Sequence, residues 1–504
     1  MTAMIRCGEQ ELTQEQLLTD AARQASGLAA LGVKAGDRVA IVVRNEPAFV
    51  SVSFAVRMLG AVPVPANWHW KGAELAFLLK DSESRVAVAH ADLLETVEHA
   101  APEDAVIIEA PVPDAVARGT RLSAEDTQPS GRHRDLAWLT DHDPWTTPPP
   151  GSTSSMIYTS GTTGNPKGVL REPADPEQEA EVNKLLGFGL SLAPGMTTLV
   201  PAPLYHSAPN VHALVAVRLG CDLTLMPRFD PEELLRLIER HRVEHVQMVP
   251  TMFHRLLALP EAVRERYDIS SLRAVVHAAA PCPPEEKRAM IEWWGPIITE
   301  YYGGTETGIV VHATSEQWLA HPGTVGAPVA DAAVRIVGAD GAELPAGETG
   351  EIYLRPPSAW PQFTYLGRPE ARAEMERDGF LTLGDVGHVD GDGFLWVTDR
   401  VKDMVIAGGV NIYPVEIEQC LLGLKGVRDA AVIGVPDPDL GEALAAHIEL
   451  LDGAVLSEDE VRDHVRRELA AYKVPRLVVF EEALPREDSG KLFKRRLRER
   501  YQAA

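Results

Sequence analysis

The chain has 504 residues, too many for one ordinary hydrophobic core, so a large domain with a smaller one is the default expectation. Its 73 acidic residues outnumber the 48 Lys and Arg residues, and a net charge of -25 repels phosphate backbones and argues against nucleic acid as a partner. The chain has no signal-peptide core, no apolar run that spans a bilayer and no CxxC pair among its four cysteines, which together predict a cytoplasmic protein without a zinc knuckle or a disulfide framework.

Apolar residues recur at helical spacing over residues 12–31, and residues 38–43 form an apolar run typical of a short buried strand. The same interleaving continues further along the chain. Strands are expected at 105–108, 245–249 and 273–277, and helices at 232–239 and 284–294. Strands that alternate with helices predict an α/β fold with largely parallel sheets.

The pattern changes near residue 330. Residues 331–355 and 380–399 look like short strands between Gly-rich turns, which indicates a β-rich subdomain. A compact α+β unit follows. We therefore predict a large N-terminal domain over residues 1–400, made of layered α/β subdomains and the β-rich subdomain, and a small mobile α+β domain over residues 401–504.

The strongest chemical motif runs from Tyr158 to Gly168 with the sequence Y-T-S-G-T-T-G-N-P-K-G. Its glycines let backbone N–H groups approach an anion closely, and its hydroxyls add further donors. Lys167 supplies a point charge for phosphate oxygens. The alternative is a Ser/Thr/Gly-rich surface loop, but so many phosphate-suited groups together favour a phosphate site. The motif is not a Walker A loop, because Pro166 stands where that loop needs Gly before its Lys.

A second motif, Y-G-G-T-E-T-G, runs from Tyr302 to Gly308. Tyr302 can stack on a nucleotide base, and Thr305 can donate to a phosphate. Glu306 can hold Mg²⁺, a hard cation that prefers carboxylate and phosphate oxygens. A Gly-rich turn with a capping Thr would look the same in isolation, so the phosphate loop that precedes this motif is what favours a nucleotide site.

These two motifs resemble the signatures of the acyl-adenylate-forming enzymes, which include acyl-CoA synthetases, coumarate-CoA ligases, luciferases and nonribosomal-peptide adenylation domains. The resemblance covers nearly the whole chain. Within this family, the chain is most similar to the acyl-CoA synthetase branch. It implies a nucleotide site formed by Thr159, Ser160, Gly161, Thr162, Thr163, Gly164, Lys167, Ala279, Ala280, Tyr302, Gly303, Asp385 and Arg400. It implies that the catalytic residues are Lys491, Thr305, Glu306 and His206, with Glu306 holding Mg²⁺.

Three later segments extend the resemblance. Asp385 can accept two hydrogen bonds from a ribose diol, although Leu383 stands where relatives usually have Thr and a turn between strands would also explain an Asp. Lys402 corresponds to the hinge of the small domain, and the neighbouring loop corresponds to a pantetheine tunnel for coenzyme A. The tunnel glycines are Gly408 and Gly409. Lys491 would offset the repulsion between a carboxylate and a phosphate. The alternative is that Lys491 only begins a basic, solvent-exposed run at the end of the chain.

The resemblance also implies an acyl pocket formed by Tyr205, His206, Asn210, His277 and Gly304. Amino-acid-activating relatives usually have an Asp at the position of His206, so this His argues against an α-amino acid. The alternative is a His packed in the core. Residues 280–296 are similar to actinobacterial synthetases that handle fatty or bulky alicyclic acids, and these are the acids we expect here.

The sequence thus predicts an enzyme that uses ATP and Mg²⁺ to convert a small-molecule carboxylic acid into acyl-AMP and pyrophosphate, and then transfers the acyl group to coenzyme A. A homodimer is one expected state, because dimers are frequent in the family. The coenzyme A phosphates are expected to meet the basic side chains of Arg466, Arg467, Lys494 and Arg495.

Three other functions stay open at this point: an adenylating enzyme that loads a separate carrier protein, a luciferase-like oxygenase, and a non-catalytic acyl or nucleotide sensor. Coenzyme A dependence separates the first from the predicted function. The pattern His241-Arg-Val-Glu-His245 fits an inverted zinc-protease motif, but the expected helix ends near His241, which argues against a zinc site.

Overall fold

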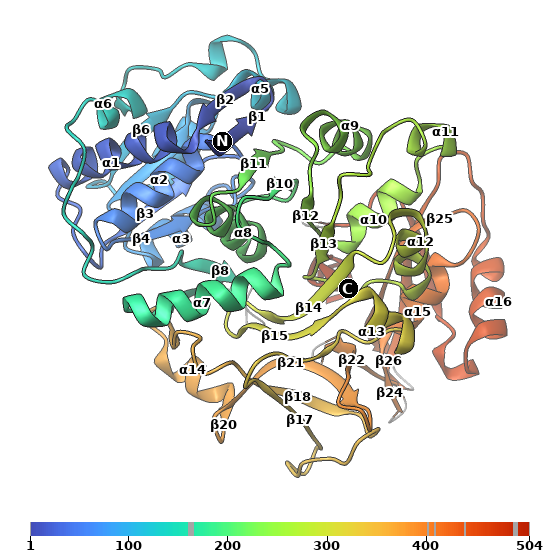
Figure 1. Cartoon of the computed structure of the whole chain (residues 1–504). Coiled ribbons are helices and arrows are strands. Elements are labelled where there is room, and N and C mark those ends of the chain that lie inside the picture. Colours follow the sequence, from blue (N-terminus) through green and yellow to red (C-terminus); the bar gives the residue numbers. More distant parts are fainter. Residues whose placement is uncertain are drawn as a thin grey trace.

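The computed structural model describes residues 2–159, 166–400, 403–407, 410–437, 440–486 and 492–502. Figure 1 shows a mixed α/β chain with a blue N-terminal lobe, a green and yellow second lobe, an orange β-rich part and a red C-terminal part. The predicted α/β fold, with a large N-terminal domain and a smaller C-terminal one, is therefore confirmed. The boundary after residue 400 stays a prediction.

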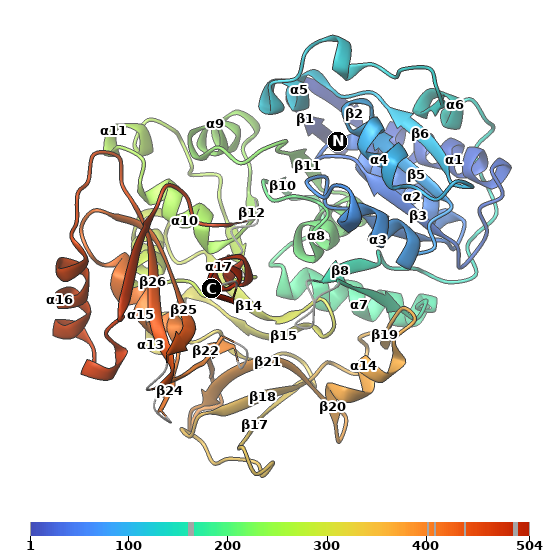
Figure 2. The same ribbon diagram turned by 180° about the vertical axis from the view of Figure 1, so that it is seen from behind.

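A five-stranded parallel sheet forms the first lobe. Its strands, in spatial order, are β4 (Val62–Pro65), β3 (Arg38–Val42), β5 (Val86–His90), β6 (Val106–Ala110) and β7 (Arg134–Asp135). The helices around it are α1 (Gln14–Ala30), α2 (Pro47–Met58), α3 (Ala73–Asp81), α4 (Leu94–Ala100), α5 (Asp114–Thr120) and α6 (Leu136–Thr140). Successive side chains of β3 enter two different cores, one under α1 and α2 and the other under α3 and α4. The sheet is thus covered on both faces, as Figure 2 shows from behind.

A nine-stranded sheet forms the second lobe. Its strands are β16 (Ala327–Pro328), β15 (Gly308–Ala313), β14 (Ile298–Gly304), β13 (Ala274–His277), β12 (His245–Met248), β10 (Thr197–Val200), β11 (Asp222–Leu225), β1 (Met4–Cys7) and β2 (Gln10–Thr13). Its helices are α7 (Pro176–Gly189), α8 (Ser207–Arg218), α9 (Pro231–His241), α10 (Pro250–Leu257), α11 (Glu261–Arg264), α12 (Pro284–Trp294) and α13 (Ser315–Ala320). The central strands pair in parallel, whereas β14 and β15 form an antiparallel hairpin.

The His241-to-His245 pattern is divided between two of these elements. Helix α9 ends at His241 because Arg242 adopts a left-handed backbone conformation, and His245 lies on β12. The two histidines therefore do not share the helix face that the zinc-protease motif requires.

The β-rich part contains two small sheets. One has the strands β17 (Ala333–Val337), β18 (Gly350–Arg355), β21 (Phe380–Val389), β20 (Glu376–Arg377) and β22 (Leu395–Arg400). The other has β19 (Phe363–Tyr365), β9 (Lys167–Arg171) and β8 (Ile157–Thr159), and α14 (Pro369–Glu374) follows β19. The second sheet therefore joins the phosphate-loop segment to a strand nearly two hundred residues later, which brings the motifs of the site together.

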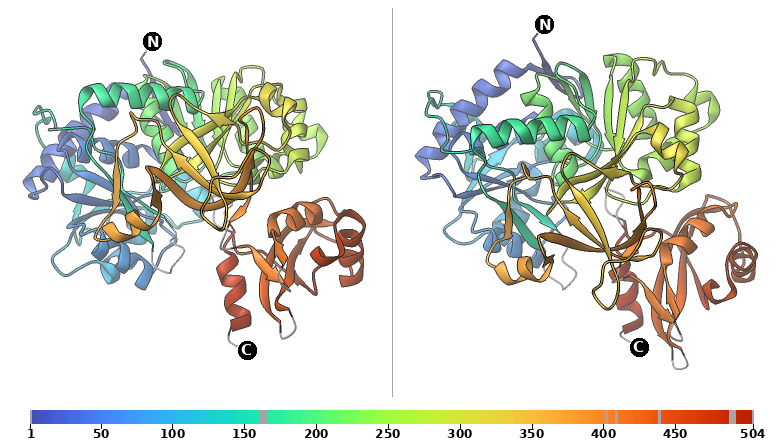
Figure 3. Two further views of the ribbon diagram at one scale, coloured as in Figure 1. Left: turned by 90° about the horizontal axis from the view of Figure 1, so that it is seen from below. Right: turned by 60° about the horizontal axis from the view of Figure 1, so that its bottom comes forward.

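The C-terminal part has its own sheet and core. Its elements are β23 (Val405–Ala407), β24 (Val410–Ile412), α15 (Pro414–Leu422), β25 (Val427–Asp437), β26 (Gly441–Leu450), α16 (Glu458–Glu468), β27 (Leu477–Glu481) and α17 (Lys494–Gln502). Figure 3 shows this part as a separate red body beside the large domain. Within the part of the chain that the structure describes, no helix is both long and apolar enough to cross a bilayer.

Candidate active site

A cavity of ≈ 2710 Å³ runs through the large domain and reaches the C-terminal part. It collects nearly all the described residues that the sequence predicted for the site. Those that line it are Thr159, Lys167, Tyr205, His206, Asn210, Ala279, Ala280, Tyr302, Gly303, Gly304, Thr305, Glu306, Asp385 and Arg400. The motifs are far apart in the sequence, so their convergence supports one shared site.

Three strands bring Tyr302, Asp385 and Arg400 together. Tyr302 lies on β14, and Asp385 and Arg400 face each other in the pairing of β21 with β22. The Tyr302 hydroxyl donates to Asp385 Oδ2 at 2.7 Å, and Arg400 Nε donates to Asp385 Oδ1 at 3.2 Å. Burial, reinforced by the Asp385 carboxylate, raises the pKa of Tyr302, so its hydroxyl stays a donor. These two hydrogen bonds orient both oxygens of the Asp385 carboxylate at the cavity wall. A diol could donate hydrogen bonds to the same oxygens.

Glu306 lies in the turn between β14 and β15 and faces the phosphate-loop segment. Its Oε1 accepts hydrogen bonds from the Tyr365 hydroxyl at 2.9 Å and from Thr159 Oγ1 at 3.4 Å. Thr159 is paired with Lys167 across β8 and β9, and the Lys167 ammonium lies 5.0 Å from the centre of the Tyr365 ring. A carboxylate beside a hydroxyl and an ammonium fits a magnesium-bound polyphosphate, because Mg²⁺ takes one or two protein carboxylates and otherwise phosphate and water oxygens.

The sequence did not predict a role for Arg171, which supports the Thr305–Glu306 turn through hydrogen bonds to its backbone. Its Nη2 donates to the backbone carbonyls of both Thr305 and Glu306, the latter at 3.0 Å, and its guanidinium lies 5.0 Å from the centre of the Trp360 ring. Burial lowers the pKa of Arg171 to about 10, with Glu306 opposing the shift, so the side chain stays charged near neutral pH. The only signal in the sequence was a charged residue at the end of an apolar strand.

Trp360 also fixes the far side of the turn. Gly308 has a positive φ of 67°, and a Cβ at that position would lie 2.2 Å from the Trp360 ring. A glycine is therefore needed for both the backbone conformation and the close packing. The Thr305–Glu306 turn is thus held between a buried guanidinium and an indole.

Of the predicted acyl-pocket residues, Tyr205, His206 and Asn210 lie around the start of α8, and Gly304 ends β14. Tyr205 packs edge-on against Trp68 at 4.6 Å between ring centres and lies 4.4 Å from the His206 ring. Asn210 donates to the Leu204 carbonyl at 3.0 Å. Tyr205, His206 and Asn210 line the cavity, and this wall suits a flat or apolar acid.

His277 is placed differently. It is fully buried at the end of β13, packs edge-on against Phe253 at 5.1 Å and does not line the cavity. Its Nε2 lies 3.6 Å from Glu300, which also pairs with Lys287. The structure therefore does not bring His277 to the acyl pocket, because the ring turns into the core behind the cavity wall.

Several predicted site residues lie outside the described part of the chain. They are Ser160, Gly161, Thr162, Thr163 and Gly164 of the phosphate loop, Lys402 of the hinge, Gly408 and Gly409 of the tunnel loop, and Lys491.

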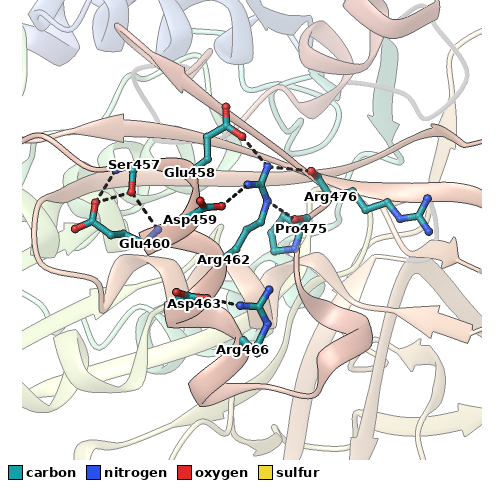
Figure 4. Close-up of polar contacts among 9 residues, drawn as sticks. All are labelled: Ser457, Glu458, Asp459, Glu460, Arg462, Asp463, Arg466, Pro475 and Arg476. Atoms are coloured by element: carbon teal, nitrogen blue, oxygen red, sulfur yellow. Dashed lines mark hydrogen bonds and ion pairs between the residues drawn. The ribbon is translucent and has the colours of Figure 1, made fainter.

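Three of the four basic residues expected to meet coenzyme A have acidic partners in the structure. Arg466 on α16 pairs with Asp463, beside Arg462, whose guanidinium donates to two backbone carbonyls (Figure 4). Lys494 pairs with Glu418 at 2.8 Å and is buried, and Arg495 pairs with Glu499 at 2.8 Å. Any phosphate that binds these side chains has to compete with those carboxylates.

The fold combines a large α/β domain with a small C-terminal one, and residues of both line the cavity that collects the predicted motifs. The model of the AMP-binding enzyme family matches residues 1–362, and that of the AMP-binding enzyme C-terminal domain matches residues 416–491. The chain belongs to the AMP-binding enzyme family.

Named relatives cover almost the whole chain. It is 38% identical over 499 residues to a feruloyl-CoA synthase of Amycolatopsis sp., spanning 99% of this chain and 95% of the relative. It is 31% identical over 507 residues to the long-chain-fatty-acid–CoA ligase FadD13 of Mycobacterium tuberculosis, spanning 98% and 93%. Among solved structures, ATP-bound MatB from Rhodopseudomonas palustris matches with a TM-score of 0.83, 28% identity and coverage of 99% and 96%. The o-succinylbenzoate CoA synthetase MenE from Bacillus subtilis, in complex with its acyl-adenylate, matches with a TM-score of 0.81, 27% identity and coverage of 98% and 95%.

Proposed function

We propose that this chain uses ATP and Mg²⁺ to activate a carboxylic acid without an amine and passes the acyl group to coenzyme A. Its family and its relatives make it an AMP-forming acid–thiol ligase. One observation supports the roles proposed for individual residues: five of them line the same cavity. They are Thr159, Lys167, Glu306, Asp385 and Arg400.

In the first step we assign the ribose hydroxyls of ATP to the Asp385 carboxylate, oriented by Tyr302 and Arg400. Thr159 and Lys167 would hold phosphate oxygens, and Glu306 would hold Mg²⁺, which when bound would supply positive charge for the polyphosphate. A carboxylate oxygen of the acid forms a bond to the α-phosphorus, and the bond from that phosphorus to the bridging oxygen breaks. The work of the protein is positioning and charge stabilisation, with Lys491 over the reacting oxygens.

In the second step the small domain turns about Lys402, which withdraws Lys491 and brings the loop with Gly408 and Gly409 to the site. The thiol of coenzyme A loses its proton and forms a bond to the acyl carbon, and AMP leaves with the electron pair of the broken bond. One cavity then serves both reactions.

The acid itself is not an amino acid in this proposal, because His206 stands where an amine would need a carboxylate partner. The cavity wall formed by Tyr205 and His206, with Trp68 packed against Tyr205, supports an acid with an aromatic or otherwise apolar body. The relatives named for feruloyl and long-chain fatty acids fit the same range. A homodimer and a cytoplasmic location are further parts of the proposal.

The test is an acid panel incubated with the full-length protein, ATP, Mg²⁺ and coenzyme A, and read by mass spectrometry for acyl-AMP and acyl-CoA. We expect acyl-CoA with at least one aromatic or fatty acid, and its loss in Asp385→Ala. Acyl-AMP without acyl-CoA would instead indicate a carrier protein as the acceptor. Failure of every acid to yield either product would contradict the proposal and favour a sensor.

A further inference from the structure

The cavity also extends along helix α8, which begins next to His206. Val211, Leu214, Val215 and Arg218 recur at helical spacing, so they share one face of α8, and all four line the cavity. An α-helix rises 1.5 Å per residue, so the path from His206 to Arg218 is about 18 Å long. The cavity therefore extends well beyond the space that an activated carboxylate needs.

Helix α7, which contacts α8 directly, adds to the lining of this channel. Val182 and Leu186, one helical turn apart, line the cavity there, and Ile309 of β15 adds to the wall. All three side chains are apolar, and Leu186 and Ile309 belong to the largest hydrophobic core. The body of a molecule in this channel must therefore be mostly apolar.

Two arginines stand at the far end of the channel. Arg57, near the end of α2, donates from Nη2 to Ser155 Oγ at 3.3 Å, whereas its buried Nε has no hydrogen-bond partner among the described residues. Arg218 donates to Asn183 Oδ1 at 3.3 Å and lies 3.5 Å from Glu179 Oε1. An apolar channel thus ends in guanidinium groups, one of which retains an unused buried donor.

The charged side chains at the arginine end of the channel carry a net positive charge. The charged groups that act on Arg57 are Arg218 and Glu179, and the same Glu179 oxygen also accepts from Ser152 Oγ at 2.6 Å. Burial, followed by the positive charge of Arg218, lowers the pKa of Arg57, and Glu179 opposes the shift. Two half-buried guanidinium groups near one carboxylate repel each other, and an added anionic oxygen would offset that repulsion.

We propose that Arg57 and Arg218 form a subsite for a second carboxylate at the far end of the substrate, so that the preferred acids are long α,ω-dicarboxylic acids with an apolar chain. The proposal rests on the function proposed above and specifies its substrate. The planar guanidinium fork matches a carboxylate in geometry and charge, and the length of the channel requires a long spacer. A purely structural role, in which the arginines only fasten α2 and α8 to α7, predicts no such preference.

The experiment compares kcat/KM for monocarboxylic acids and α,ω-dicarboxylic acids of equal length, over a series of chain lengths, with the full-length enzyme, ATP, Mg²⁺ and coenzyme A. We expect an optimal length at which the diacid is preferred at least about tenfold, the factor for one net hydrogen bond to a charged group. Equal or better turnover of the monoacid at every length would overturn the proposal. If no acid of either series is activated, the proposed function fails as well, which distinguishes the two outcomes.

Variants separate recognition from packing. We expect Arg218→Met and Arg57→Met to lower kcat/KM for the diacid about tenfold, mainly through KM, while leaving the monoacid unchanged or improved. Arg218→Lys should restore part of the diacid preference. Glu179→Gln, which removes the competing carboxylate, should increase that preference.

Equal losses with both kinds of acid in the Met variants would show a structural role and contradict the subsite. Where a Met variant folds poorly, Glu179→Gln alone still decides the question, because a structural role predicts no gain for the diacid.

Discussion

The Tyr302 hydroxyl donates a 2.7 Å hydrogen bond to the Asp385 carboxylate, although the two residues are 83 positions apart in the chain. Tyr302 belongs to the large sheet and Asp385 to the β-rich part, so the bond joins two sheets at the cavity. The carboxylate orientation proposed for ribose binding therefore depends on a residue from another subdomain.

Tyr302→Phe removes that donor and leaves Arg400 as the described side chain that still orients Asp385. A lost hydrogen bond to a charged group costs about 1.5 kcal/mol or more, which corresponds to about a tenfold higher KM for ATP. The KM for the acid should stay unchanged. Steady-state kinetics would check this, with Tyr353→Phe on β18 as the matched control, and an unchanged KM for ATP would contradict the role of Tyr302.

Arg171→Met should weaken the Thr305–Glu306 turn, because it removes the donors to both carbonyls. We expect the rate of acyl-AMP formation to fall about ten- to a hundredfold, because two partly buried carbonyls lose their donor. The Mg²⁺ concentration needed for half-maximal rate should rise. Arg171→Lys should recover part of the loss. The matched control is Arg335→Met, because Arg335 also lies over an aromatic ring, that of Phe380, but does not line the cavity. A normal Mg²⁺ dependence in Arg171→Met would show that the arginine acts only on folding.

Lys491→Ala should separate the two half-reactions. The proposed ammonium offsets charge repulsion only while the carboxylate attacks the phosphate, so acyl-AMP formation should fall at least about a hundredfold, within the range of losses seen for a single electrostatic group. Conversion of added acyl-AMP and coenzyme A into acyl-CoA should remain within about threefold of the wild type. The exposed Lys425→Ala is the control, and equal losses in both half-reactions would refute the assignment.

Asp399 should make stability depend on pH. Its carboxylate is 5% exposed and accepts from the backbone N–H groups of Arg400 at 2.7 Å and Val415 at 3.1 Å. Burial raises its pKa from 3.8 to about 6, with Lys494 opposing the shift. Between these values the folded state binds a proton that the unfolded state does not, so the free energy of unfolding should fall as pH rises from about 4 to about 6.

The measurement is the free energy of unfolding of wild type and Asp399→Asn from pH 4 to 7. The difference between the two proteins should change by up to ~3 kcal/mol across this window, because Asn does not titrate. Asp452→Asn, which alters a 95% exposed side chain, should show no such difference. Parallel pH profiles for wild type and Asp399→Asn would contradict the raised pKa.

The local pattern of apolar residues in the sequence predicted many of the helices and strands. The expected helix at 284–294 is α12, the expected strand at 273–277 begins one residue later as β13, and the helix expected over 232–239 is α9, one residue longer at its start and two at its end. These segments have apolar residues at a regular period, which is a property of neighbouring residues. Helix α2 was not predicted, because it is buried on most of its surface and so lacks a polar face.

The sequence by itself determined the family motifs, their order and the alternation of strands and helices, because glycine-rich loops and hydrophobic periodicity are local features. Only the tertiary structure decided that Arg171 supports the turn of Glu306, that His277 turns into the core, and that Arg57 and Arg218 line the same cavity. Arg171 and Glu306, and likewise Arg57 and Arg218, are more than a hundred positions apart. These relationships depend on how whole sheets and helices pack, which no short stretch of sequence encodes.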